Sequence, residues 1–347
     1  MKVLISPMYG IGDTLLITPA IKVLKKSRPD IHLTCLTFQK PAYDILFNNP
    51  YIDQLEFFPF LKKSKIEGLI YILKNYTGKF DVTLNFYPTN RLEYNLFAFF
   101  TFSKERLGHS YIKKNFSQLN FLKNKKIKES YHLHCVEENI KLLELLDIHC
   151  EDIPAMEIYL TEKEMEEGRK YLNSLSVKRI KIGIHTGSSN FKNHYHRRWP
   201  KEKFLELINE LKDFDFILFG TEEEKEENLF ILNNSIHNNV KLIENKTIRE
   251  VAAIIKNLSL FLSNDSGLMH LASTVGIPVV AIFGPTNPNW VRPWKVKHKV
   301  VRLDLSCSPC FYYSPKPLYC KIKEKFKCIR EIEVEMVKKA ICELLEM

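Results

Sequence analysis

Short apolar runs, rich in β-branched residues, alternate along the chain with segments whose apolar residues recur at helical spacing. In the first half, the apolar runs predict strands at residues 2–7, 31–38, 53–60 and 81–88. The segments between them predict helices at residues 13–26, 41–50 and 62–76. Strands that alternate with helices are typical of a parallel sheet covered on both faces. The first half is therefore predicted to be a doubly wound α/β domain.

A charged segment at residues 151–177, with a helix predicted at 161–175, leads into a second run of the same alternation. Residues 179–189 run from a strand into a glycine turn, and further strands are predicted at 213–221, 240–244, 260–265 and 277–285. Helices are predicted at residues 201–212, 229–233, 248–258, 266–276 and 333–346. We place the domains at 1–165 and 166–330, followed by a C-terminal helix at 331–347. Two such domains in series are the expected layout of an enzyme with a cleft between its domains.

Lysine and arginine number 51 against 41 aspartate and glutamate, which gives a formal net charge of +10. This excess favours an anionic partner, namely a nucleotide, a phosphorylated glycolipid, a membrane surface or nucleic acid. A lysine-rich proteome would give the same balance, and no nucleic-acid recognition motif is present. The N-terminus does not resemble a signal peptide, and the longest apolar run, residues 95–102, is too short to span a membrane. We therefore expect a cytoplasmic protein that rests on a membrane or is free of it.

A glycine turn follows the first predicted strand and contains Gly10, Gly12 and Asp13. Glycines allow the backbone to turn tightly and approach a ligand, but the third glycine of the dinucleotide fingerprint is absent, which argues against NAD. Asp13 lies at the carboxyl edge of the predicted sheet, where open α/β sheets bind ligands, and it suits a general base. A helix N-cap is the alternative role for Asp13.

A second glycine turn follows the strand at the start of the second domain, and its small polar residues suit phosphate oxygens. They are Thr186, Gly187, Ser188 and Ser189. Arg197 and Arg198 come just before the next predicted helix, and an arginine fork suits a diphosphate. A polar loop with basic surface residues would show the same pattern.

The third motif, at residues 263–270, ends one predicted strand and opens a helix. The free amides at Ser266 and Gly267 would face a phosphate or a ribose at this helix N-terminus. His270 falls one turn further, on the same helix face as Ser266. Alternatively, Asp265 caps the helix and His270 is an ordinary core histidine.

Together the segments GIGDTLLITPAIKVLKK, HTGSS…RRWPKEKFLELI and SNDSGLMHLASTVGIPVVAIFGPTNP resemble glycosyltransferase family 9, the bacterial ADP-heptose:lipopolysaccharide heptosyltransferases. The segment HLHCVEENIKLLELLDI at residues 132–148 adds to this resemblance. It implies the GT-B fold, with two Rossmann-like domains facing a cleft, the acceptor held by the N-terminal domain and the nucleotide sugar by the C-terminal domain. It also implies an inverting transfer that needs no metal or other cofactor for catalysis.

The resemblance further implies roles for single residues. Asp13 would take the proton from the acceptor hydroxyl, and Arg197, in place of the family's usual lysine, would stabilise the departing diphosphate, the largest expected catalytic effect. The donor-binding residues that it implies are Gly12, Thr186, Gly187, Ser188, Ser189, Arg198, Glu224, Asp265, Ser266, Gly267 and His270. Glu224 falls where the family has a carboxylate on the ribose, although Glu222 and Glu223 leave this register open.

Basic residues gather in the half expected to hold the acceptor, at residues 62–65, 113–114 and 123–128. An anionic lipid-linked saccharide or a membrane surface would suit them. We assign Lys62 and Lys63 to acceptor binding, together with His134 from the family-like segment at 132–148. For most of these lysines a solvated surface is the alternative.

Four cysteines lie close together in the sequence: Cys307, Cys310, Cys320 and Cys328. Four thiolates within one short loop suit a tetrahedral zinc or iron ion with a structural role, since four protein ligands close the site. A family subgroup that heptosylates proteins is known for an iron-binding cysteine finger with a different spacing. The alternative is four free thiols that pack a loop.

Two other patterns are set aside. Asp213-Phe214-Asp215 is similar to the metal-binding DxD of another glycosyltransferase fold, but it precedes a strand and so should lie at the wrong edge of the sheet. The histidines at 185, 194 and 196 suggest a polar loop rather than a metal site.

The sequence therefore predicts an inverting glycosyltransferase that transfers heptose from ADP-heptose to a lipopolysaccharide or lipooligosaccharide core, at the cytoplasmic face of the inner membrane and without nucleic acid as a partner. A family member with another nucleotide sugar or with a protein acceptor is the nearest alternative. A non-catalytic sugar-nucleotide binding protein is the alternative from another functional class.

Overall fold

The computed structural model describes residues 1–6, 10–312 and 316–347, which fall into two compact units. The first unit is Met1–Tyr159, and the second comprises Leu160–Tyr312 and Lys316–Met347. The chain passes from one unit to the other at residue 159, six residues before the predicted boundary. Helix α7 (Glu162–Ser174) belongs to the second unit because it packs along α10 (Ile248–Ile255), where Gly168 leaves no room for a side chain beside Ala253. The last helix, α14 (Val334–Leu345), also packs within the second unit, against α8 (Lys201–Glu210) and β12 (His298–Val301).

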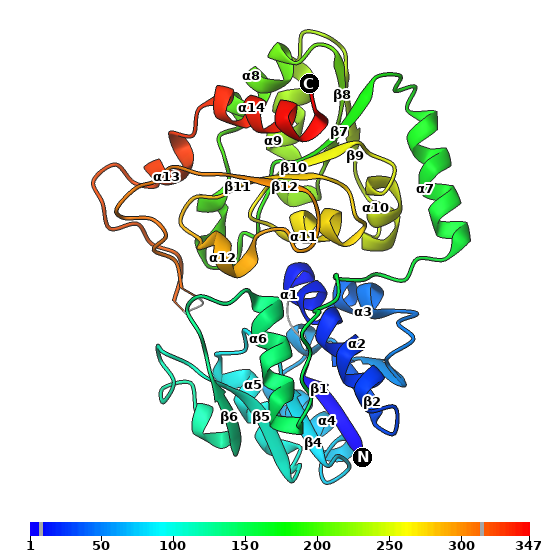
Figure 1. Cartoon of the computed structure of the whole chain (residues 1–347), viewed down its shortest axis with the longest axis vertical. Helices are drawn as coiled ribbons and strands as arrows, with labels where there is room; N and C mark the ends of the chain where they lie inside the picture. The colour runs from blue at the N-terminus through cyan, green and yellow to red at the C-terminus, as the bar shows by residue number, and fades with distance from the viewer. Residues whose placement is uncertain (7–9, 313–315) are drawn as a thin grey trace. The chain divides into compact units, whose positions relative to one another are not determined.

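The first unit contains a parallel six-stranded sheet in the order β3-β2-β1-β4-β5-β6 (Figure 1). Its strands are β1 (Lys2–Ser6), β2 (His32–Thr37), β3 (Gln54–Phe57), β4 (Val82–Asn85), β5 (Glu105–Ser110) and β6 (Lys125–Lys128). Its helices are α1 (Ile11–Leu16), α2 (Thr18–Ser27), α3 (Lys40–Leu46), α4 (Lys65–Asn75), α5 (Leu92–Phe100) and α6 (Cys135–Leu142). The helix predicted at 13–26 is two helices, because Pro19 lacks the amide that would continue the first one and suits the first turn of the next.

Helices α4 and α5 cover one face of this sheet. Ile72 and Tyr76 of the α4 region pack with Tyr94 and Phe97 of α5 against Leu4 of β1. The right-handed crossovers that run from β3 to β4 and from β4 to β5 place both helices on the same side. The apolar side chains of both helices thus form one core.

The second unit repeats the design, with the parallel order β12-β11-β10-β7-β8-β9. Its remaining strands are β7 (Ile180–His185), β8 (Phe214–Phe219), β9 (Val240–Ile243), β10 (Leu260–Asn264) and β11 (Val279–Ile282). Its remaining helices are α9 (Lys225–Asn234), α11 (Gly267–Thr274), α12 (Pro288–Val291) and α13 (Lys327–Arg330). All residues of β8 and β10 are buried, as expected for strands covered on both faces.

In each sheet the strand order reverses once, between β1 and β4 in the first unit and between β7 and β10 in the second. Open parallel sheets bind ligands at such switch points, beyond the carboxyl ends of the strands. The first glycine turn follows β1, and the other two motifs follow β7 and β10. The architecture is the doubly wound, two-domain fold that the sequence predicts.

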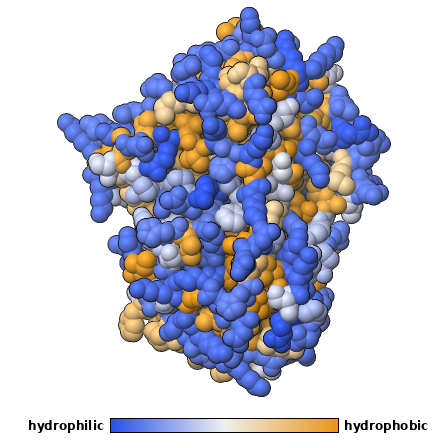
Figure 2. Space-filling view, viewed as in Figure 1, coloured by the Kyte–Doolittle hydropathy of each residue, from blue (hydrophilic) through white to orange (hydrophobic). Residues whose placement is uncertain are grey.

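The surface is ordinary over much of its area. Hydrophilic residues cover most of the face in Figure 2, and hydrophobic ones are exposed there in scattered patches, as is usual for globular proteins. Among the described residues, no helix combines the length and the apolar character that crossing a bilayer requires.

Candidate active site

Asn264, the last residue of β10, ties together the segments that meet at the switch point of the second unit. Its Nδ2 donates to the carbonyl oxygen of Thr186 at 2.6 Å, and its Oδ1 accepts a hydrogen bond from the Trp199 amide at 2.9 Å. The turn after β7 and the Arg197–Arg198 segment are therefore held against the end of β10. Sequence reasoning assigned Asn264 no role, although its position at the end of a buried strand was visible.

Arg197 and Asp265, which are 68 residues apart in sequence, form a buried ion pair. One guanidinium nitrogen of Arg197, Nη1, donates to Asp265 Oδ2 at 2.8 Å, and Nη2 donates to His194 Nδ1 at 2.6 Å. The guanidinium carbon lies 5.0 Å from the centre of the Phe311 ring. Burial is the largest single effect and opposes ionisation of Asp265, but the Arg197 charge and the hydrogen bonds from Thr286 and Arg197 together outweigh it and lower the pKa of this carboxyl below its usual value.

The amides at the start of α11 are not capped by a side chain. Ser266 is the N-cap residue, which overturns the alternative that Asp265 caps the helix, and its hydroxyl instead lies within hydrogen-bond distance of His185 Nδ1 (2.9 Å) and Ser263 Oγ (3.0 Å). The helix begins at Gly267, directly after this N-cap residue. Such a helix N-terminus attracts an anion, because its free amides point outward along the helix dipole.

Two hydrogen-bonding atoms near Asp265 are buried without a hydrogen-bond partner among the described residues, namely Arg197 Nε and His270 Nδ1. Burial lowers the pKa of His270 to about 4, so its ring is neutral at physiological pH. Buried polar atoms are nearly always paired in native proteins. Two such atoms beside the start of α11 make this edge of the sheet a candidate ligand site.

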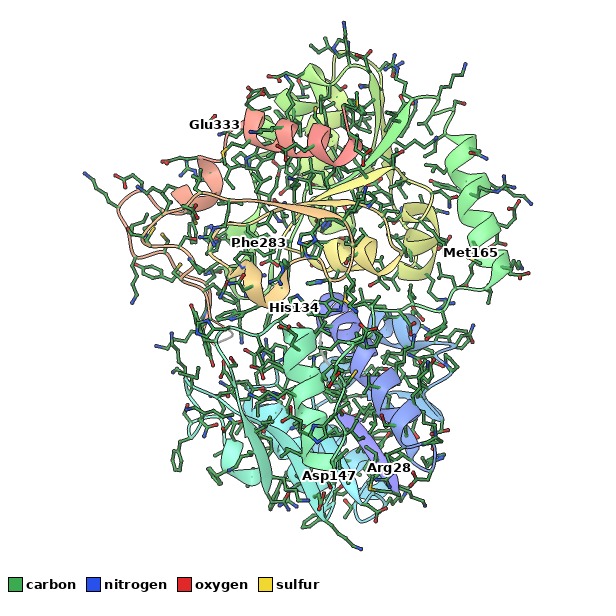
Figure 3. All side chains as sticks on the ribbon, in the orientation of Figure 1. Arg28, His134, Asp147, Met165, Phe283 and Glu333 are labelled. Carbon is green, nitrogen blue, oxygen red and sulfur yellow. The ribbon has the colours of Figure 1, made fainter. Side chains whose placement is uncertain are left out.

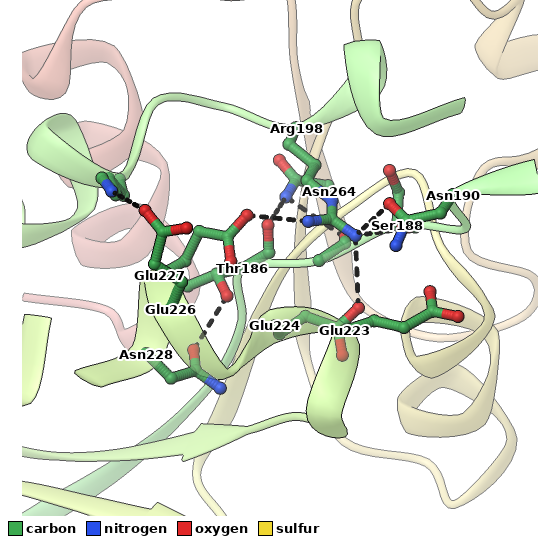
Figure 4. A network of polar contacts seen from close by, with 12 residues as sticks. Thr186, Ser188, Asn190, Arg198, Glu223, Glu224, Glu226, Glu227, Asn228 and Asn264 are labelled. Carbon is green, nitrogen blue, oxygen red and sulfur yellow. Dashed lines mark hydrogen bonds and ion pairs between the residues drawn. The ribbon is translucent and has the colours of Figure 1, made fainter. Parts of the chain in front are cut away.

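Arg198 and Glu224 lie beside the turn that follows β7 (Figure 4). Glu224 is the only buried member of the run 222–224, and its Oε2 accepts hydrogen bonds from the amide and hydroxyl of Thr221, both at 2.9 Å. Arg198 lies 3.5 Å from Glu224 Oε1 and donates to Glu227 at 2.7 Å. A Cβ added to Gly187 would come within 2.4 Å of Glu224, so only glycine fits beside this carboxylate.

The remaining polar residues of this turn are largely held within the loop. Thr186 donates from its hydroxyl to Asn228 Oδ1 at 2.8 Å, and Ser188 donates to the carbonyl oxygen of His194 at 2.8 Å. Ser189 is exposed and accepts a hydrogen bond from the Phe191 amide at 3.1 Å. These contacts fix the shape of the loop.

In the first unit, α1 begins after Gly10, which is its N-cap, and Gly12 and Asp13 lie in its first turn. Asp13 is therefore not the cap residue, and its half-buried carboxylate comes within 3.2 Å of where a Cβ on Gly10 would lie. An anionic carboxylate in a first helical turn is favoured by the helix dipole. Residues 7–9 of the preceding turn lie outside the described residues.

The predicted acceptor residues lie in different environments. Lys62 and Lys63 are exposed, and Lys63 lies 3.4 Å from Glu67. His134 is fully buried at the start of α6 (Figure 3), where its Nδ1 accepts a hydrogen bond from the Val136 amide. The structure thus gives His134 a helix-capping role, and acceptor contacts of all three residues stay a prediction.

The four-cysteine segment packs beside the loop that carries Arg197. Cys320 and Cys328 are buried, and the pKa of Cys328 is raised to about 12 by burial and by the neighbouring charges of the other three cysteines. Within the described residues, however, no group of three or more His, Cys, Asp or Glu side chains has the arrangement that holds a metal ion. A structural zinc or iron ion therefore stays a prediction, without support from the geometry.

The two patterns that we set aside have structural roles. Asp215 lies near the start of β8, at the amino edge of the sheet, and its Oδ2 accepts hydrogen bonds from the amides of Lys178 and Arg179. The three histidines diverge, since His194 accepts from Arg197 while His196 stacks on Phe326 with ring centres 3.9 Å apart. Asp215 and these histidines thus have structural partners among the described residues.

Comparison with known proteins agrees with this geometry. The model of glycosyltransferase family 9 (heptosyltransferase) matches residues 77–318. A lipooligosaccharide heptosyltransferase 2 of Campylobacter jejuni subsp. jejuni serotype O:2 is 26% identical over 97% of this chain and 96% of its own length.

Two solved structures show the same fold. A family 9 glycosyltransferase from Veillonella parvula superimposes with a TM-score of 0.80 at 22% identity, over 100% of this chain and 98% of that one. The Escherichia coli ADP-heptose lipopolysaccharide heptosyltransferase II does so with a TM-score of 0.75 at 18% identity, over 100% and 99% of the two chains. The two doubly wound units therefore constitute a GT-B fold, as predicted. On this evidence the chain belongs to glycosyltransferase family 9, the heptosyltransferases.

Proposed function

We propose that this enzyme transfers a heptose from ADP-heptose to the core saccharide of a lipopolysaccharide or lipooligosaccharide, with inversion at the anomeric carbon. The observation that carries the donor half of the proposal is the pair of unpartnered buried atoms beside Asp265, Arg197 Nε and His270 Nδ1, next to the uncapped N-terminus of α11. Family membership and the names of the similar heptosyltransferases support the sugar and the acceptor.

The departing diphosphate is the group that this site suits best. Glycosyl transfer leaves negative charge on the diphosphate, and hydrogen-bond donors fixed in place before the reaction stabilise that charge without reorganisation. Arg197 is held by Asp265, His194 and Phe311, so its guanidinium is oriented before the donor binds. The α11 amides and the neutral His270 ring add uncharged polar contacts.

The nucleoside is assigned to the other side of the turn. Glu224 offers a buried carboxylate beside Gly187, and carboxylates suit the two hydroxyls of a ribose. Thr186, Ser188 and Ser189 shape the backbone around it, and Arg198 balances the charge of Glu224. This division places the diphosphate between Glu224 and Asp265 along the sheet edge.

On the acceptor side, Asp13 is the proposed general base. A carboxylate that takes the acceptor proton contributes about 10²–10⁴-fold to the rate. The exposed Lys62 and Lys63 suit an anionic, lipid-linked saccharide, and His134 orders the start of α6 within the same unit. Such an acceptor is made at the cytoplasmic face of the inner membrane, which is the proposed location of the enzyme.

Calorimetric titration with ADP, UDP and GDP, and then with ADP-heptose, tests the donor. Selective binding of ADP that is strengthened by the heptose is the expected result. Preference for UDP or GDP would overturn the donor assignment but keep the fold. Transfer of heptose to a purified core acceptor distinguishes the enzyme from a binding protein, and failure of transfer by protein that binds ADP-heptose would refute the acceptor.

The cysteine segment carries a separate proposal, a structural zinc or iron ion held by Cys307, Cys310, Cys320 and Cys328. Its support is the sequence, in which the four thiols fall within 22 residues. Metal analysis of protein purified without chelators, beside a Cys320→Ser/Cys328→Ser variant, tests it. One equivalent of metal in the wild type only is expected, and metal-free wild-type protein with intact thiols would leave the cysteines as packing residues.

A further inference from the structure

Helix α4 of the first unit exposes an apolar stripe to solvent. Ile66 is 72% exposed, Ile70 58% and Leu73 42%, and Leu61 in the turn before the helix is 64% exposed. At about 100° per residue, the three helical positions fall within an arc of about 60°. The stripe therefore runs along one side of the helix for its whole length.

The same helix packs on the sheet through its other side. Gly68 and Ile72 are the buried residues of α4, and they lie on the helix side opposite Ile70. Ser64 caps the helix and forms a capping box with Glu67, which fixes where the helix starts and hence its register. The helix therefore cannot rotate to bury the stripe, because its opposite side already packs on the sheet.

Lysines surround this stripe. Residues 61–79 contain five exposed lysines at positions 62, 63, 65, 74 and 79, against the single acidic residue Glu67. By the helical spacing Lys74 borders the stripe on one side, whereas Lys65 lies in the first turn of the helix, toward the side of Ile72. A helix with an exposed apolar side and lysines at its borders has the pattern of a segment that lies in the interface of an anionic bilayer.

A second exposed apolar group lies in the same layer of the first unit. The short 3₁₀ turn Asn120–Leu122 packs against α5, which itself contacts α4. Around this turn Phe116 and Phe121 are exposed with their ring centres 5.3 Å apart, and Lys113 and Lys114 are exposed beside them. Two clusters that each combine large apolar side chains with lysines occur on the sheet side that α4 and α5 cover.

We propose that α4 and the turn before it, residues 61–74, dock the enzyme on an anionic lipid bilayer, with Ile66, Ile70 and Leu73 inserted among the lipid acyl chains. This surface deepens the proposed function by naming the contact with the membrane that carries the acceptor. The charge pattern favours lipid over a protein partner, because lysines lie at both ends of the stripe and residues 61–79 contain Glu67 as their single acidic residue.

Sedimentation of the full-length protein with vesicles tests the surface. Vesicles of phosphatidylglycerol and phosphatidylethanolamine are the probe, and vesicles of phosphatidylcholine alone are the neutral control. We expect binding to the anionic vesicles that weakens when salt is raised from 0.1 to 0.5 M, since lysine–lipid attraction is screened. Equal binding to both vesicle types, or binding to neither, would overturn the proposal.

Variants locate the contact. Ile66→Ser/Ile70→Ser should weaken vesicle binding about tenfold or more, because two apolar side chains no longer leave water. Ile236→Ser is the matched control, since Ile236 is 73% exposed in the second unit, and it should bind as the wild type does. Circular dichroism verifies that both variants are folded, and Lys65→Gln/Lys74→Gln should lose mainly the preference for anionic lipid. Wild-type binding by the double isoleucine variant would refute the location.

Two further readouts separate this surface from other roles. Light scattering measures the molar mass of wild type and Ile66→Ser/Ile70→Ser, and a mass that falls only in the variant would show that a second copy of the chain covers the stripe. Transfer to a delipidated, soluble acceptor should be unchanged in this variant, whereas transfer to acceptor in vesicles should fall. Loss of transfer to the soluble acceptor would contradict the proposal, whereas failure of ADP-heptose as donor would bear only on the proposed reaction.

Discussion

Replacing Arg197 with methionine removes the guanidinium group while keeping much of the aliphatic stem. In the structure this guanidinium donates to Asp265 at 2.8 Å and to His194 at 2.6 Å, inside a buried site. Two separate losses follow from this geometry. The transition state loses one fixed donor to the diphosphate, and the folded protein is left with a buried aspartate that has lost its counter-ion.

The two losses have different sizes and different readouts. Loss of one fixed donor to a developing anion lowers kcat by about 10²–10³-fold. A buried group left without its partner costs about 1–3 kcal/mol of unfolding free energy, or about 2–12 °C of melting temperature for a domain of this size. We expect Arg197→Met to show both effects, measured by release of ADP during heptosyl transfer and by thermal melting.

The double variant Arg197→Met/Asp265→Asn separates the two roles, because asparagine has the shape of aspartate without its charge. Relative to Asp265→Asn alone, adding Arg197→Met should still lower kcat about 10²–10³-fold while costing little additional stability. If Arg197 acted only as the counter-ion of Asp265, adding Arg197→Met on that background would leave kcat unchanged. That result would refute the assignment of Arg197 to the diphosphate.

The pH dependence gives an independent control. Arg197 lowers the pKa of Asp265, so the pair stabilises the folded state above the ordinary aspartate pKa of about 4, and this contribution is lost as the pH falls through the lowered pKa. The difference in melting temperature between wild type and Arg197→Met should therefore be largest near neutral pH and shrink below pH 4. A difference that persists unchanged at low pH would point to lost packing instead of lost charge.

Three other predictions test the site and the fold. Asp13→Asn should lower transfer by at least about 10²-fold with ADP binding unchanged in calorimetry, and unchanged turnover would exclude it as the base. Gly187→Ala should displace Glu224, because its Cβ would come within 2.4 Å of that side chain, and should weaken ADP binding about tenfold or more. Glu164→Gln should cost about 1–2 kcal/mol at neutral pH, because Arg249 and the Thr161 hydrogen bonds together lower the pKa of Glu164 from 4.5 to about 2, and partial solvent exposure weakens this contribution. The deficit in urea unfolding should shrink as the pH falls from 4.5 to 2, and a deficit that is constant with pH would refute the ion-pair account.

The sequence predicted most of the fold because buried parallel strands appear in it as continuous apolar runs. Strands such as β8 and β10 are continuous apolar runs, and no other arrangement buries them as well. Strands β5, β6 and β12 were not predicted, because each contains charged or polar residues. Strands β6 and β12 also lie at sheet edges. An edge strand gains its structure from pairing with its neighbour, so its own residues carry little information.

For the candidate site, the sequence located the three turns but not the contacts among them. Each turn follows a strand of a parallel sheet, so its place at the carboxyl edge follows from chain order alone. The ion pair of Arg197 with Asp265, the link from Asn264 to Trp199, and the Phe311 ring on Arg197 join residues that are far apart in sequence. No local pattern encodes such pairs, because they depend on how separate segments approach one another.

Helix α4 shows most plainly which features follow from the sequence and which from tertiary packing. The sequence by itself predicted a basic helix at residues 62–76, where the structure has α4 at Lys65–Asn75, because helical periodicity and charge are local properties. Only the tertiary structure decided which apolar residues of this helix face the core: Ile72 is buried, while Ile66 and Ile70 are left in solvent. The reason is physical, since a helix with apolar residues on two sides can bury either one, and packing against the sheet selects between them.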